Sequence, residues 1–249
     1  ITLFSYKLIF NSYFEGDEWY WMRILHETYA APDWFSKIFL ASFHSRDMTN
    51  PHVIPISDGY QLLQFHFFGL QYSHYVVTSL LGHFINTLLV AIFTFLYCNS
   101  KKIAITAGLL FAALTTHSQA VTWMAAVVNT QPALFFGLLS LIFSLLFART
   151  NKKRYFAGTL LSLLCSVLSK ETAVIFLALA PMLYISEKRN EYPTSFWQYF
   201  GFISVVLAFF GVQYGARFDG AFVLENSQEP WLYMFLAKFD AFDVSLFIF

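Results

Sequence analysis

The chain has 249 residues, and its 15 basic and 15 acidic side chains give a formal net charge of zero. Only 12% of the residues are charged and 57% are hydrophobic, whereas soluble domains have about 25% charged and about 45–50% apolar residues. This composition excludes an ordinary soluble domain and favours an integral membrane protein. It also provides no basic field for nucleic acid, so we expect no nucleic-acid partner.

The chain begins at Ile1 and stops at Phe249 within an apolar run, so we expect it to be part of a longer protein. Residues 1–10 are typical of the end of a first membrane span. The tryptophans of the polar and aromatic region 11–73 stand among aliphatic residues and scattered charges. We therefore expect this region to be a first outer loop with helices in the membrane interface.

Residues 74–216 contain most of the membrane helices that we expect in a single all-α, polytopic transmembrane domain, and residues 217–249 form a segment on the outer side. Residues 75–98 form an apolar run long enough to cross a core of about 30 Å, and further spans are expected over residues 103 to 115 or 128, 132–148 and 195–216.

The apolar block 155–186 is interrupted by Ser169, Lys170 and Glu171. A single helix would place Lys170 and Glu171 near the centre of the bilayer, which costs several kcal/mol. In a helical hairpin both ends of the block lie on the same side of the membrane. Lys170 and Glu171, at the turn, then lie in a recess on the opposite side. We expect the hairpin, because it also places the flanking basic clusters on one side, as the positive-inside rule prefers.

This topology separates the charges by side. The three loops that we expect on the cytoplasmic side carry a net charge of +6, and the rest of the chain carries −6. We expect the bilayer to be that of a bacterial inner membrane or of the endoplasmic reticulum. The charged residues of these loops are Lys101, Lys102, Arg149, Lys152, Lys153, Arg154, Glu187, Lys188, Arg189 and Glu191.

An acidic pair, Asp17 and Glu18, follows the first expected span and lies beside Glu15. Clustered carboxylates can share a proton and raise one pKa, which suits a general base. They can equally bind a divalent cation through oxygen, or be plain solvated surface charges. The sequence leaves these three interpretations open.

Three further polar groups are candidates for binding a substrate. Lys170, beside Glu171, can neutralise a phosphate at the floor of an outer recess, or the two can merely cap helix ends. His83 and Asn86 favour an interhelical hydrogen bond over a relay or ligand, and His83 or His74 can also ligate a pigment. His117 and Gln119 lie near the outer end of a span, where they can touch a substrate or cap a helix.

The order of these motifs resembles that of the GT-C membrane glycosyltransferases, specifically the protein O-mannosyltransferase-like group that includes tetratricopeptide-tailed members and bacterial relatives. The family's acidic catalytic pair corresponds to Asp17-Glu18. Its later landmarks are similar to residues 68–86 with His83, to 111–123 with His117 and Gln119, and to 168–174 with Ser-Lys170-Glu171.

The resemblance implies a GT-C-like helix bundle that transfers a mannose-like sugar from a polyprenyl-phosphate donor to an acceptor hydroxyl on the non-cytoplasmic face. Asp17 would be the base, with Glu18 assisting, and Lys170 would face the donor phosphate. Several family positions differ, which leaves open a catalytically lapsed subunit of a larger membrane complex. These departures are Ile54 before Pro55, Leu114-Thr115, Gln119, Val127 and Asn129. A transporter is a third interpretation, although no repeat is visible.

Overall fold

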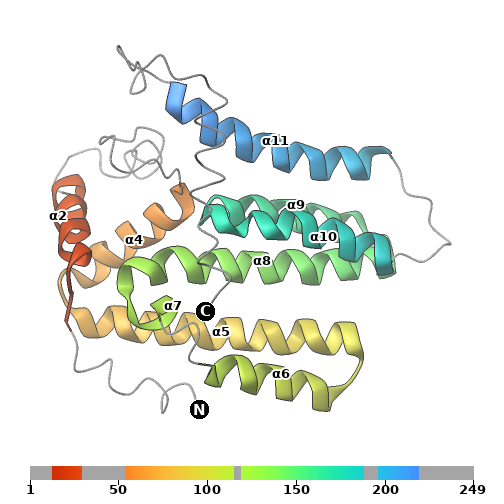
Figure 1. Cartoon of the computed structure of the whole chain (residues 1–249), viewed down its shortest axis with the longest axis horizontal. Coiled ribbons are helices and arrows are strands. Elements are labelled where there is room, and N and C mark those ends of the chain that lie inside the picture. The colour runs from red at the N-terminus through yellow and green to blue at the C-terminus, as the bar shows by residue number, and fades with distance from the viewer. Residues whose placement is uncertain (1–12, 30–53, 115–118, 188–195, 219–249) are drawn as a thin grey trace.

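The computed structural model describes residues 13–29, 54–114, 119–187 and 196–218. Within these ranges every regular element is a helix (Figure 1), which confirms the all-α prediction. The elements are α2 Asp17–Tyr29, α4 Pro55–Phe68, α5 Tyr72–Cys98, α6 Lys101–Ala113, α7 Gln119–Thr122, α8 Met124–Thr150, α9 Lys153–Val167, the 3₁₀ helix η3 Glu171–Ala173, α10 Val174–Glu187 and α11 Phe196–Phe218.

Helix α8 is the centre of the bundle. It packs against α5 on one side and against α9 and α10 on the other, while α11 covers α9 and α10. The long helices run alongside one another, and α2, α4 and α7 gather at one end of them (Figure 1). We call this the α2 end, and the opposite end, where α5 turns into α6 and α8 into α9, the basic end.

Two turns of the same construction define the basic end. Asn99 and Asn151 adopt left-handed backbone conformations with φ of 51° and 52°, which asparagine tolerates at a helix C-terminus. Their N–H groups donate to the carbonyl oxygens of Phe95 and Phe147, each at 2.8 Å. Lysines follow each asparagine within two residues. The first two of the three expected basic loops therefore lie at this end.

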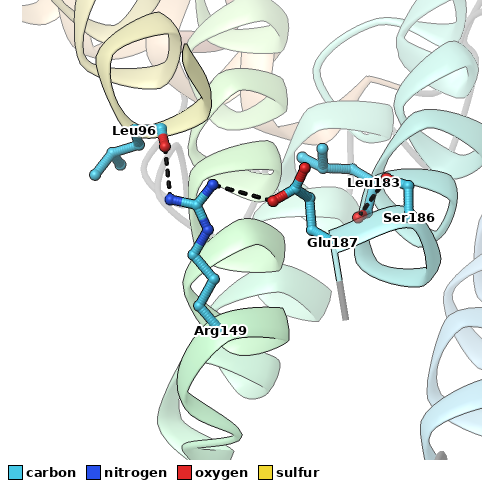
Figure 2. Close-up of polar contacts among 5 residues, drawn as sticks. All are labelled: Leu96, Arg149, Leu183, Ser186 and Glu187. Carbon is cyan, nitrogen blue, oxygen red and sulfur yellow. Dashed lines mark hydrogen bonds and ion pairs between the residues drawn. The ribbon is translucent and has the colours of Figure 1, made fainter. Parts of the chain in front are cut away.

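The interruption near Lys170 is a hairpin turn, as predicted. Arg149, near the end of α8, donates to Leu96 O at 2.6 Å and to Glu187 Oε2 at 3.0 Å (Figure 2). These bonds join the C-terminal ends of α5, α8 and α10. Helix α10 therefore returns to the basic end from which α9 departs.

The start of the central helix differs from the prediction. Helix α8 begins at Met124 rather than at Pro132, and α6 ends at Ala113, so the option of a third span continuing to residue 128 is wrong. The polar residues of the first turns are accommodated inside the helix, because Asn129 and Thr130 donate to the backbone oxygens of Ala125 and Ala126. Polarity in the sequence therefore did not mark the helix boundary.

Among the described residues, α5 and α8 are the two helices long and apolar enough to cross a membrane, each with a mean hydropathy of 1.9. Only a third of the apolar window of α5 is buried inside the bundle, against 61% for α8. The first expected span, most of the first loop and residues 219–249 lie outside the described ranges. Helices α2 and α4 occupy parts of the loop predicted over residues 11–73.

A close approach between α8 and α10 provides a test of this packing. A Cβ added at Gly137 would overlap the ring of Phe176, whereas a Cβ at Gly211 would meet nothing. We expect Gly137→Ala to lower the free energy of unfolding by about 1–3 kcal/mol. Gly211→Ala should leave it unchanged or raise it by up to about 1 kcal/mol. Thermal unfolding of the purified protein in detergent measures both, and equal melting temperatures would contradict the packing.

Candidate functional site

The α2 end brings together segments that are far apart in the sequence. Helix α4 packs against α2 and also binds the turn between α9 and α10. In that turn Leu168 O accepts from Ile56 N at 3.2 Å, and Ser169 O accepts from the Ser57 hydroxyl at 2.7 Å. Ser57 and Ser169 are fully buried. Helix α4 thus links α2, which begins with Asp17 and Glu18, to the turn that carries Lys170.

Asp17 is the first residue of α2, and its side chain lies outside the described residues. The neighbouring Glu18 is 4% exposed. Its Oε1 accepts from Met124 N at 2.6 Å, and its Oε2 accepts from Glu15 N at 2.9 Å. The second bond, with the bond from Glu18 N to Glu15 O at 3.0 Å, closes a tight turn at the start of α2.

The first bond places a carboxylate at the N-terminus of α8, where backbone N–H groups lack helical partners and a negative charge is favourable. Because each carboxylate oxygen of Glu18 accepts from a backbone N–H group, this geometry gives Glu18 a positioning role. Glu18 fixes the start of α2, where Asp17 lies, against the start of α8.

Lys170 lies in the turn between α9 and α10, outside both helices, and is partly buried. Burial lowers the pKa of its ammonium group, and the carboxylate of Glu171 partly offsets that effect. The backbone of the turn is held by Ser166, whose carbonyl oxygen accepts from Lys170 N at 3.2 Å and whose hydroxyl donates to Ala133 O at 2.7 Å. A partly desolvated ammonium group suits the binding of an anion, because an anion stabilises its charged form.

His83 does not join this group. It lies eleven residues into α5, roughly 16 Å along the helix from Tyr72, is 3% exposed and stacks on Phe111 with ring centroids 5.3 Å apart. Asn86, one turn further on, donates to Gln131 O at 3.2 Å. The pair therefore lies in helix interfaces inside the bundle.

His117 lies outside the described residues. Gln119 is the first residue of α7, and its side chain lies outside the described residues as well. The backbone of α7 is held against α5, because Val121 O accepts from the Ser79 hydroxyl at 2.6 Å. The predicted contact of His117 and Gln119 with a substrate stays a prediction.

Gln131 is a central residue that the sequence analysis did not single out. Its side-chain nitrogen donates to the carbonyl oxygens of Ser79 and Ala120, each at 3.0 Å, and so joins α5, α7 and α8. Its side-chain oxygen lies where a Cβ of Gly82 would be. The only signal in the sequence was a polar stretch, residues 129–131, next to a proline within an apolar run.

Within the part of the chain that the structure describes, no three His, Cys, Asp or Glu side chains gather as metal ligands. The divalent cation considered for the acidic segment stays a prediction. Comparison with protein families, with curated protein sequences and with solved structures finds no match.

The positioning role of Glu18 predicts a large loss of stability on truncation. Glu18→Ala leaves the buried N–H of Met124 without its acceptor, which costs about 1–3 kcal/mol. Glu27 on the same helix pairs with Arg23 at 3.9 Å on the surface, so Glu27→Ala should change stability by less than about 1 kcal/mol. Thermal unfolding followed by circular dichroism compares the two variants. A Glu18→Ala protein as stable as Glu27→Ala would overturn the role.

Proposed function

We propose that the chain is a polytopic integral membrane protein with a GT-C-like architecture that transfers a sugar from a polyprenyl-phosphate donor to an acceptor hydroxyl. The observation that carries the proposal is the double attachment of α4, which packs against α2 and binds the Lys170 turn at one end of the bundle. The base expected at Asp17 and the cation expected at the donor phosphate thus belong to segments joined by one helix.

The orientation follows from the separation of charge. The described basic residues of the loops, among them Lys101 and Lys153, lie at the basic end, while Glu18 and Lys170 lie at the α2 end. By the positive-inside rule the basic end is cytoplasmic. Transfer then takes place on the opposite face, at a bacterial inner membrane or at the endoplasmic reticulum membrane.

In the proposed reaction the acceptor hydroxyl oxygen attacks the anomeric carbon of the sugar. The bond between that carbon and the phosphate oxygen breaks, and the polyprenyl phosphate leaves with the electron pair, so the anomeric configuration is inverted. Asp17 takes the proton of the hydroxyl group as general base. The ammonium group of Lys170 stabilises the negative charge that develops on the leaving phosphate, and Glu18 holds the start of α2 in place.

A second function, that of a non-catalytic subunit in a larger membrane complex, is favoured by one observation. Both carboxylate oxygens of Glu18 accept from backbone N–H groups, so one member of the acidic pair has a structural task. Such a subunit would co-purify with its partner complex, carry no polyprenyl phosphate and show no turnover.

The proposed base is tested by Asp17→Asn. Loss of a general base lowers the rate of transfer by about 10²–10⁴-fold, while the exposed control Glu27→Gln should keep the wild-type rate. The assay reconstitutes the purified chain in vesicles with radiolabelled polyprenyl-phosphate mannose and an acceptor alcohol. Wild-type transfer by Asp17→Asn would rule out this base, and a wild-type protein without transfer would favour the subunit.

The proposed phosphate contact predicts a dependence on pH. Because burial lowers the pKa of Lys170 from the usual 10.5, its charge is lost at a lower pH than that of a surface lysine. The affinity for a polyprenyl-phosphate sugar, whose phosphodiester stays a monoanion, should therefore fall with rising pH, and at a lower pH than it would beside a surface lysine. Lys170→Arg keeps its charge and should flatten this dependence. Equilibrium binding across pH 7–10 measures both, and identical profiles would contradict the contact.

A further inference from the structure

A cavity of about 490 Å³ lies between α4, α5 and α8. Its volume is within the range of about 300–1,000 Å³ that is typical of ligand pockets. Each helix provides apolar wall residues, including Tyr60 and Leu63 from α4, Ile85 from α5 and Phe135 from α8. No step of the proposed transfer uses this space.

The cavity is apolar even where polar residues line it. Asn86 and Gln131 are 2% and 7% exposed, and their side-chain nitrogens are bonded to backbone oxygens inside the bundle. Their side-chain oxygens have no hydrogen-bond partner among the described residues, but they are buried and so are not exposed at the cavity wall. The wall therefore presents hydrocarbon to an occupant, which suits an aliphatic chain and disfavours a polar molecule.

The cavity reaches the outer surface of the bundle. Leu63 and Ile85, which line it, are 46% and 36% exposed. The neighbouring side chains Leu81 and Leu88 on α5 are 55% and 46% exposed. The cavity is thus continuous with the apolar surface that we propose faces the lipid.

One end of the cavity lies next to the turn that carries Lys170. Pro55 and Ile56 line this end, and Ile56 N donates to Leu168 O two residues before Lys170. A lipid chain in the cavity would therefore have its headgroup near an ammonium group, which complements a phosphate.

We propose that this cavity binds a hydrocarbon chain of a phosphate-bearing membrane lipid, with the phosphate at Lys170. The position of the headgroup rests on the phosphate role proposed above for Lys170, whereas the binding of the chain rests on the cavity alone. Burial of each methylene group contributes about 0.8 kcal/mol, so a long chain provides enough free energy to hold the lipid.

Photo-crosslinking tests the binding of the chain. The full chain is placed in phosphatidylcholine vesicles that contain a trace of phosphatidic acid with a diazirine in its acyl chain, and labelled peptides are mapped. We expect labelling of α4 and α8 peptides around Leu63 and Phe135. Ile85→Trp fills the cavity and should lower this labelling several-fold, whereas Leu88→Trp, one turn further along α5 and outside the cavity, should leave it unchanged.

Equal labelling of the two tryptophan variants would mean ordinary boundary lipid and would overturn the proposal. Leu63→Trp, which fills the cavity from α4, should repeat the effect of Ile85→Trp if the cavity itself is responsible. Comparable melting temperatures of the variants show that the loss of labelling does not come from unfolding.

The same experiment tests the headgroup separately. Lys170→Gln should lower labelling by the phosphatidic acid probe several-fold but leave labelling by a diazirine diacylglycerol probe, which has no phosphate, unchanged. An effect of Ile85→Trp without an effect of Lys170→Gln would overturn the position of the phosphate and keep the chain site. Sugar transfer is not measured here, so failure of the proposed transferase activity is distinguishable from failure of either part.

Discussion

The buried carboxylate of Glu18 is the contact on which the α2 end depends. The helical path breaks at Trp123, between α7 and α8, and a break inside a bundle exposes backbone N–H groups that must find partners. One carboxylate oxygen of Glu18 accepts from Met124 N, and the other accepts from Glu15 N just before α2. The side chain of Glu18 therefore joins the start of α8 to the acidic segment at the start of α2. This attachment positions the neighbouring residue Asp17.

Other polar side chains inside the bundle, like Glu18, fix the positions of helices relative to one another. Gln131 and Ser79 join α7 to α5 and α8, and Ser57 joins α4 to the Lys170 turn. Apolar packing is not directional, and in lipid it gives little preference for one helix arrangement over another. Buried hydrogen bonds between side chains and backbone oxygens supply that preference, and they concentrate where the candidate site lies.

The sequence predicted the helical class and the hairpin near Lys170, because apolar length and charge placement are local signals. It placed the start of α8 at Pro132, because side chains such as Thr130 satisfy their polarity through bonds that only the folded helix offers. The positioning role of Glu18 and the importance of Gln131 depend on contacts across 106 and 52 residues. No pattern along the chain reveals such partners, so the sequence could indicate the acidic segment but not how it is held.

The attachment made by Arg149 has a mechanical consequence. It fastens the ends of α5, α8 and α10 to one another at the basic end, whereas α9 and α10 are joined at the other end by a turn bound to α4. Helices held together at one end can separate only by pivoting about it. Any widening that admits a large ligand would then be greatest at the α2 end, with Arg149 close to the pivot.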